Sequence, residues 1–296
     1  MMKKNNKKSG PFWSQKGAPA SKLGKNKRKK LERKSFDAEI EKEKVKSRSK
    51  KKKLDETIKK IEPMRLNRFI AKAGVCSRRD ADDIIASGKV KVNGKVVTEF
   101  GVRVSPKDKV EYRGKVLVAE KLVYFLYNKP KNTISTTSDP LGRNTVIDAI
   151  ESSTQERVYP VGRLDRNTTG LLILTNDGDV AKKLTHPSHK TPKLYKARLD
   201  KVIPEEDLYQ LLQGIELEDG IAKADKVDYV LGQPQNEVGI RIHIGRNRVV
   251  RRMFKALGYQ VEALDRVMIA HLTKKNLPRG KWRPLTEKEI GYLKML

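Results

Sequence analysis

The chain has 296 residues and carries 66 Lys and Arg against 36 Asp and Glu, a formal net charge of +30 at pH 7. That length allows one large domain or two ordinary ones with their own hydrophobic cores. So positive a charge indicates a phosphate-rich partner, nucleic acid first and an anionic membrane surface second. No stretch reaches the roughly 18 consecutive apolar residues of a membrane span, and residues 1–8 lack the apolar segment of a secretory signal.

The single cysteine, Cys76, excludes an intramolecular disulfide and any zinc site that needs several cysteines. The four histidines are His186, His189, His243 and His271. The first two have a ligand-like spacing, but no cysteine or His-Glu-x-x-His context accompanies them. We therefore expect no metal and a reduced, cytoplasmic protein.

Positive charge is concentrated near the start of the chain, where residues 1–60 hold 23 Lys and Arg against 7 Asp and Glu. Few of these residues are apolar, so the segment cannot bury enough surface to offset the entropy of ordering. We predict a disordered polybasic arm over residues 1–62. An arm that strengthens RNA association non-specifically is favoured over a merely solubilising tail.

A folded pattern begins at Met64. Apolar residues at helical spacing precede Gly74, and Ser77 can cap a second helix over Arg78–Ser87. Two valine-containing segments then flank Asn93-Gly94, a dipeptide typical of a tight hairpin turn. Two short helices followed by a hairpin predict a small α/β module over residues 63–118.

This module is rich in basic residues, and its arrangement resembles the S4-type RNA-binding domain of ribosomal proteins, some tRNA synthetases and RNA-modifying enzymes. The resemblance rests on an Arg-Leu-Asn-Arg opening, a Ser-Arg-Arg segment and a Val-Lys-Val-Asn-Gly-Lys hairpin. It implies binding of structured RNA and says nothing of catalysis. The candidate RNA-binding residues are Arg65, Arg68, Lys72, Arg78, Arg79, Lys89 and Lys91.

Residues 119–296 have the pattern of a second domain. Strand-like runs are expected at residues 123–127, 171–175, 194–200, 227–231, 238–244 and 259–269. Helices are expected at residues 178–185, 204–213, 248–257 and 286–293. Because strands outnumber helices and hairpin-like spacings recur, we predict an α+β fold whose mixed, largely antiparallel sheet carries peripheral helices. Neither a Gly-x-Gly-x-x-Gly nor a Walker-type loop is present, so no nucleotide cofactor is indicated.

One carboxylate in this domain stands out. Asp165 lies between Arg163 and Arg166, after one apolar segment and before another. Positive neighbours hold an acid ionised. An ionised carboxylate suits nucleophilic work better than acid catalysis, so Asp165 is the candidate nucleophile.

The surrounding run, Gly162-Arg-Leu-Asp-Arg-Asn-Thr-Thr-Gly170, followed by Leu-Leu-Ile-Leu-Thr-Asn-Asp-Gly178, resembles the catalytic motif of the RsuA-like pseudouridine synthases, which modify ribosomal RNA. The order of an S4-type domain and then a synthase domain is also that of the family. The resemblance implies isomerisation of a specific uridine to pseudouridine, without a cofactor and with Asp165 as nucleophile. Whether Asp165 attacks the base or the sugar stays open.

Two further motifs extend the resemblance. Lys193-Leu-Tyr195-Lys-Ala-Arg-Leu199 implies that Tyr195 lies in the active site, where it can stack on a flipped uracil and take part in C5 proton transfer. The alternative is an ordinary tyrosine of the core. The segment from Ile242 to Met253 implies that Arg251 forms a salt bridge to the catalytic aspartate.

Three residues receive weaker assignments. Arg252 follows Arg251 and is assigned to an RNA phosphate, and Arg163 either holds phosphate or hydrogen-bonds its own loop. Leu264 matches an apolar family position near the target base, with core packing as its alternative. Val249 and Ile244 depart from the family pattern, which leaves details of substrate contact open.

A site-specific ribosomal RNA pseudouridine synthase is the leading interpretation. His186-Pro-Ser188 resembles the large-subunit (RluB-like) branch more than the small-subunit branch. The alternative is a non-catalytic RNA-binding or ribosome-assembly factor on a retired synthase fold. Membrane binding is not favoured, because no amphipathic helix with a broad apolar face is seen. The expected protein is a monomer whose partner is structured ribosomal RNA.

Overall fold

The computed structural model describes residues 62–296, so the predicted polybasic arm lies almost entirely outside the described residues. By its internal contacts the chain divides into two compact units. The described part of the first comprises residues 62–64 and 103–108, and the second comprises residues 65–102 and 109–296. In the first unit, strand β4 (Arg103–Val104) leads into a turn in which Ser105 N donates to Asp108 Oδ2 at 2.6 Å.

The N-terminal part of the second unit contains the two predicted helices, α2 (Leu66–Lys72) and α3 (Arg78–Ala86), which follow the short strand β1 (Met64–Arg65). Helix α3 begins with a reciprocal cap. Asp80 N donates to Ser77 Oγ at 3.2 Å, and Ser77 N donates to Asp80 Oδ2 at 3.3 Å. Two orphan N–H groups are thereby satisfied, as the predicted Ser77 cap requires.

A four-stranded antiparallel sheet of order β3-β2-β5-β6 follows these helices. Its strands are β2 (Val90–Val92), β3 (Lys95–Val96), β5 (Val110–Tyr112) and β6 (Lys115–Val116). Asn93 and Gly94, which join β2 to β3, have φ values of 51° and 82°, the left-handed conformation that a tight hairpin turn needs. The predicted hairpin is confirmed.

The C-terminal part of the second unit is built on a nine-stranded sheet of order β11-β12-β10-β13-β9-β7-β15, with β14 beside β13 and β8 beside β9. Strands β9 and β13 pair in parallel, and the other strand pairs of this sheet are antiparallel. The mixed, largely antiparallel sheet expected from the sequence is confirmed. The strands are β7 (Tyr124–Lys129), β8 (Tyr159–Pro160), β9 (Thr169–Thr175), β10 (Lys193–Leu199), β11 (Lys226–Tyr229), β12 (Glu237–Ile242), β13 (Val261–Ile269), β14 (Leu272–Thr273) and β15 (Trp282–Pro284).

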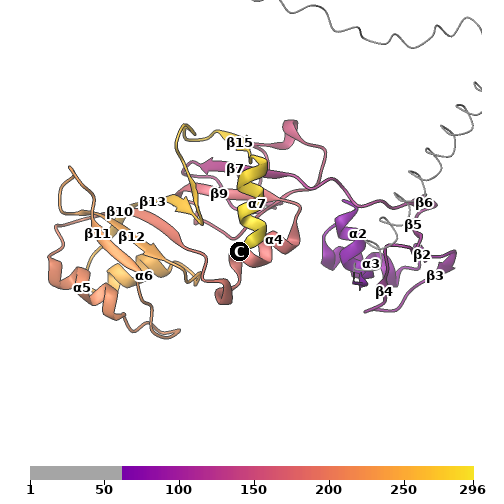
Figure 1. Ribbon diagram of the computed structural model, residues 1–296, viewed down its shortest axis with the longest axis horizontal. Coiled ribbons are helices and arrows are strands. Elements are labelled where there is room, and N and C mark those ends of the chain that lie inside the picture. The colour runs from indigo at the N-terminus through magenta and orange to yellow at the C-terminus, as the bar shows by residue number, and fades with distance from the viewer. Residues whose placement is uncertain (1–61) are drawn as a thin grey trace, which may run out of the picture. The chain divides into compact units, whose positions relative to one another are not determined.

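Helices bury both faces of this sheet. Along β7, Phe125 and Tyr127 enter one hydrophobic core, whereas Tyr124 and Leu126 enter the other. The first core also takes residues from α5 (Glu205–Gln213) and α6 (Val249–Ala256), and the second from α4 (Gly178–Thr185) and α7 (Glu287–Met295). Figure 1 shows α4 and α7 near β7 and β9, and α5 and α6 near β11 and β12. Two 3-10 turns occupy Glu151–Ser153 and Pro187–His189.

The parallel pair of β9 and β13 depends on a glycine. Gly170 lies opposite Arg266 in the register and has a φ of 108°. A Cβ at this position would lie 2.3 Å from Arg266 O and 2.5 Å from Arg266 N. Only glycine permits this backbone conformation and this close approach. Steric contact with β13 therefore requires glycine at the second position of β9.

Replacing Gly170 by Ala should therefore lower the free energy of unfolding by about 3 kcal/mol or more, from backbone strain and overlap together. Gly291→Ala is the matched control, because a Cβ there meets nothing within 4 Å in helix α7. It should stabilise the protein by about 0.5–1 kcal/mol. Urea unfolding followed by circular dichroism measures both, and a loss at Gly170 below about 1 kcal/mol would contradict the close approach.

Candidate active site

Asp165 lies in the loop between β8 and β9, and the backbone on both sides of it is held by hydrogen bonds. Ser135 Oγ donates to Leu164 O at 3.0 Å and accepts from Leu164 N at 3.2 Å. Thr168 N donates to Asp165 O at 3.0 Å. These hydrogen bonds hold the backbone that carries the carboxylate independently of any ion pair that the carboxylate forms.

A buried lysine supports the same loop. Lys129, at the end of β7, is 0% exposed, and its Nζ donates to Thr133 O at 2.8 Å, Pro130 O at 3.0 Å and Arg166 O at 3.3 Å. Burial lowers the pKa of Lys129 to about 8, although the charge of Asp165 acts in the opposite direction. The sequence pattern did not single out Lys129; its signal is a lysine that follows the apolar run 123–127 after one asparagine, Asn128.

The carboxylate of Asp165 is 40% exposed and has two cations within 4.0 Å among the described residues. Arg248 Nε lies 3.8 Å from Asp165 Oδ2, and Arg251 Nε lies 4.0 Å from the same oxygen. The expected pairing with Arg251 is thus present, but as one long contact rather than a bidentate fork. The flanking arginines, Arg163 and Arg166, form no ion pair with it within 4.0 Å in the described part of the chain, so its paired cations come from the start of α6.

Arg251 is held in place by the backbone of the neighbouring strand. Its side chain is 16% exposed, and its Nη1 donates to Val261 O at 2.6 Å. Burial lowers the pKa of Arg251, while Asp165 raises it and Arg248 lowers it. A guanidinium stays charged under all ordinary conditions, so the pair is a lasting charge contact.

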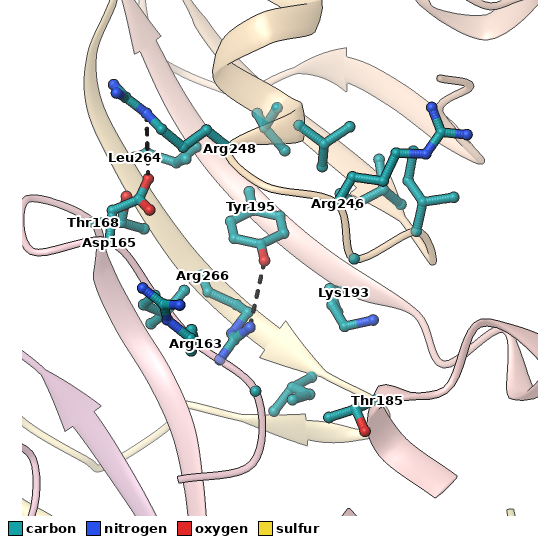
Figure 2. A pocket seen from close by; sticks show the side chains of 18 of the residues that line it. Arg163, Asp165, Thr168, Thr185, Lys193, Tyr195, Arg246, Arg248, Leu264 and Arg266 are labelled. Carbon is teal, nitrogen blue, oxygen red and sulfur yellow. Dashed lines mark hydrogen bonds and ion pairs between the residues drawn. The ribbon is translucent and has the colours of Figure 1, made fainter. Parts of the chain in front are cut away.

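Tyr195 and Leu264 lie on one face of the sheet beside Asp165. Tyr195 on β10 is 8% exposed and lies opposite Arg266 on β13 in the register. Leu264 precedes Arg266 by two residues, which puts both on the same face of the strand. Figure 2 shows the Tyr195 ring in the middle of the pocket, with Asp165 and Arg248 to one side.

Arg266 and Lys193 complete this face, and the sequence analysis assigned neither to the site. Arg266 is 3% exposed, and its Nη1 donates to Tyr195 Oη at 3.4 Å. Lys193 Nζ donates to His243 O at 3.0 Å and to Thr191 O at 3.2 Å. In the sequence, Lys193 lies two residues from Tyr195 and Arg266 lies two residues from Leu264. This spacing predicts that each pair shares a face of its strand, but the four residues share one face only if β10 and β13 are neighbours.

Two arginines, one in α6 and one in the loop before it, are held by hydrogen bonds to the segment of Asp219 and Gly220. Arg252 donates to Asp219 through Nη1 at 2.9 Å and Nη2 at 2.8 Å, and Arg246 Nη1 donates to Gly220 O at 2.6 Å. The hydrogen bond to Arg252 lowers the pKa of Asp219. The guanidinium of Arg252 is thus already paired with a carboxylate, and its predicted phosphate contact stays a prediction.

Asp165 borders two hollows. One has a volume of about 150 Å³ and is lined by Asp165, Tyr195 and Leu264 among others. A cavity of that size accepts a six-membered ring. The other, about 630 Å³, is lined in part by Arg143, Arg163, Arg166, Arg248 and Arg251. The carboxylate therefore lies between a space for one base and a wider, arginine-lined space.

The candidate RNA-binding residues of the small module lie on β1, α2, α3 and β2, apart from Lys89, which directly precedes β2. Arg68 and Lys72 are half-buried; Arg65, Arg78, Arg79, Lys89 and Lys91 are exposed. Within residues 62–296 no group of three or more His, Cys, Asp or Glu converges as a metal site requires. Nor does any helix in that range have the length and hydropathy to cross a bilayer.

Known proteins match both parts of the chain. A model of the RNA pseudouridylate synthase family matches residues 123–256, and a model of the S4 domain matches residues 64–110. A ribosomal large subunit pseudouridine synthase B from Bacillus subtilis is 46% identical over 235 residues, which cover 78% of this chain and 96% of the relative.

A protein of the same name from Haemophilus influenzae is 36% identical over 246 residues, 80% of this chain and 69% of that one. A crystal structure of a pseudouridylate synthase superposes with a TM-score of 0.57 at 32% identity, covering 78% of this chain and 99% of that one. The predicted domain boundaries at residues 62 and 118 stay predictions. The S4 match covers residues 64–110 and the synthase match residues 123–256, so neither match reaches these boundaries.

Replacing Lys129 by Met should remove a pH dependence of stability. Because the pKa of Lys129 is lowered from 10.5 to about 8, the unfolded state binds more protons between those values. Stability contributed by this group therefore rises as pH rises through that window. The difference in unfolding free energy, wild type minus variant, should rise by about 3 kcal/mol from pH 8 to 10.5.

Urea unfolding at several pH values measures this difference. Lys131→Met, at an exposed lysine two residues away, is the control and should leave the pH profile of the wild type unchanged. A constant difference between wild type and Lys129→Met across the window would contradict the burial of a charged lysine.

Proposed function

The chain belongs to the RNA pseudouridine synthase family and carries an S4 domain, and we propose that its substrate is a uridine in the RNA of the large ribosomal subunit. As a pseudouridine synthase it is an isomerase that converts uridine to pseudouridine. The large-subunit assignment is supported by the relatives from Bacillus subtilis and Haemophilus influenzae, both of which are named ribosomal large subunit pseudouridine synthase B. Cytoplasmic action is part of the same proposal.

Asp165 is the proposed nucleophile, and one observation carries the assignment. The carboxylate borders both a cavity sized for one base and a wider hollow with five arginines in its lining. A flipped uridine needs the first for its base and the second for its backbone phosphates. A negatively charged nucleophile at that junction is within reach of the bond between base and sugar.

The neighbouring side chains take supporting roles in the proposal. Tyr195 offers a ring face that replaces part of the stacking lost when the uridine leaves its helix. Leu264 packs against the same base, and Arg251 keeps positive charge beside the carboxylate. Arg163, which borders both hollows, and Arg252 are assigned to backbone phosphate.

The basic residues of the S4 module are proposed to dock the RNA outside the site. Lysine and arginine contacts to phosphate position a nucleic acid without reading its sequence. Specificity for one uridine would then come from RNA shape and from the pocket together. The polybasic arm, which lies outside the described residues, would add non-specific affinity.

Asp165→Asn should abolish isomerisation while leaving RNA binding intact. The amide keeps the size of the side chain but loses the charge and nucleophilicity, so the rate should fall by roughly 10⁴-fold or more. The assay is tritium release from large-subunit RNA labelled at C5 of uridine, with small-subunit RNA in parallel. Asp228→Asn, which alters an acid with 69% side-chain exposure on β11, is the control.

Both protein-free RNA and precursor particles should be tested, because the assembly state of the substrate is open. Tritium release by wild type and Asp228→Asn, but not by Asp165→Asn, is the expected result. Release only from small-subunit RNA would overturn the substrate assignment. Release by Asp165→Asn at the wild-type rate would overturn the role of the aspartate.

A further inference from the structure

The end of the small cavity away from Asp165 holds a buried guanidinium with an unused donor. Arg266 is 3% exposed and lines the cavity. Its Nε donates to Leu171 O at 2.6 Å and its Nη1 to Tyr195 Oη at 3.4 Å. Within the described part of the chain, Nη2 has no hydrogen-bond partner. Buried donors rarely lack a hydrogen-bond partner. A buried donor without a partner that lines a cavity indicates that a bound ligand supplies the acceptor.

A second cation lies near it. Lys193 lines the same cavity, two residues before Tyr195 on β10 and therefore on the same face of the strand. Burial lowers the pKa of Lys193 to about 8, and the second cause is the charge of Arg266. The two cations are thus close enough to repel one another.

No acid pairs directly with either cation, although the charge of Asp225 acts on Lys193 from farther away and raises its pKa. Among the described residues, neither Lys193 nor Arg266 has a carboxylate within 4.0 Å, and the one acid in the lining of the cavity, Asp165, is paired with Arg248 and Arg251. Holding two cations in a buried site without a directly paired counter-charge costs stability. Such a site is suited to a ligand that is anionic at some stage of its residence.

The reaction itself produces such an anion. When the N1–C1′ bond of uridine breaks, the bonding electron pair stays on the base, whose charge spreads over N1 and the two carbonyl oxygens. If Asp165 instead adds to the base first, the displaced pair is likewise delocalised onto a carbonyl oxygen. The demand for a hydrogen-bond donor at a carbonyl is therefore the same for both orders of bond making.

We propose that Arg266, with Lys193 beside it, donates hydrogen bonds to a carbonyl oxygen of the uracil and stabilises the negative charge of the detached base. This rests on the proposed placement of the target uridine in the small cavity. Figure 2 shows the geometry: the Arg266 guanidinium points at the Tyr195 hydroxyl, and Lys193 lies on the other side of that ring from Asp165.

The remaining steps balance without a further reactant. C5 of the base forms the new bond to C1′, and the bond that Asp165 made, to C1′ or to the base, breaks and restores the free carboxylate. The C5 proton passes to solvent, and N1 takes up a proton from solvent. Nothing is oxidised or reduced. A guanidinium stays charged under all ordinary conditions, so Arg266 acts as a fixed hydrogen-bond donor rather than as an acid.

Fixed donors act mainly on the rate. A hydrogen bond to a charged acceptor is about twice as strong as one to a neutral acceptor, so Arg266 binds the detached anion better than the intact uridine. Differential binding of this kind raises kcat and leaves KM nearly unchanged. Loss of one such donor costs about 100-fold to 1,000-fold in kcat.

The test compares Arg266→Met on RNA carrying uridine or 5-fluorouridine at the target position. Fluorine withdraws electrons, so the detached base is a weaker base and needs less stabilisation. With uridine, single-turnover loss of the target nucleoside should slow about 100-fold with little change in KM. With 5-fluorouridine the loss should shrink at least tenfold. Nuclease digestion followed by mass spectrometry measures consumption of either nucleoside.

Arg198→Met is the matched control, because Arg198 lies on β10 but is exposed and paired with Glu262. It should behave as the wild type with both substrates. Arg266→Lys keeps the charge and should recover part of the rate with uridine. Lys193→Met should show the same preference for 5-fluorouridine to a smaller degree, and it carries the test should Arg266→Met fail to fold.

An equal slowing of both substrates by these variants would overturn the proposal and leave Arg266 as a support for Tyr195. A rise in KM at constant kcat would overturn it too, since that marks ordinary ground-state binding. Asp165→Asn is run beside them. If that variant consumes uridine normally, the proposed function of the site fails independently of the result for Arg266.

Discussion

The parallel contact between β9 and β13 is the constraint on which the site depends. At Gly170 the two backbones approach so closely that a Cβ would lie 2.3 Å from Arg266 O. The Asp165 loop enters β9 directly, and Leu264 and Arg266 stand on β13. One steric condition at a glycine therefore sets how far the carboxylate lies from the sheet face that carries Tyr195, Leu264 and Arg266.

Charge is the second constraint, and it works against stability. Burial lowers the pKa of Lys129, Lys193 and Arg251, which means that folding places each cation where its charge is disfavoured. Apolar residues at such positions would cost less. A positively charged environment does, however, attract and hold a polyanion. Lys129 also holds the Asp165 loop through hydrogen bonds to three carbonyl oxygens. Function accounts for charges that packing alone would not select.

Periodicity and capping predicted the main elements well. Helix α4 covers the expected residues 178–185, and Asp177 caps it by accepting from Asp179 N and Val180 N. The long strands β9, β10 and β13 lie within two residues of their expected bounds. Strands β8, β14 and β15 were not predicted, because two or three residues are too few to display a period. Lys129 lies outside the strand expected at residues 123–127, because a local pattern does not reveal that its charge is enclosed by carbonyl groups.

The sequence by itself determined the phosphate-rich partner and the order of the two folded modules, and it singled out Asp165 and Tyr195 as candidates for the site. Each of these is carried by composition or by a short run of neighbouring residues. Only the tertiary structure decided which cations face Asp165, namely Arg248 and Arg251 rather than the flanking arginines. It also brought Arg266 to Tyr195 across 71 residues of chain and gave Arg252 a carboxylate partner. The physical reason is that strand order and register bring together residues far apart in the chain, and no local pattern records which strands become neighbours.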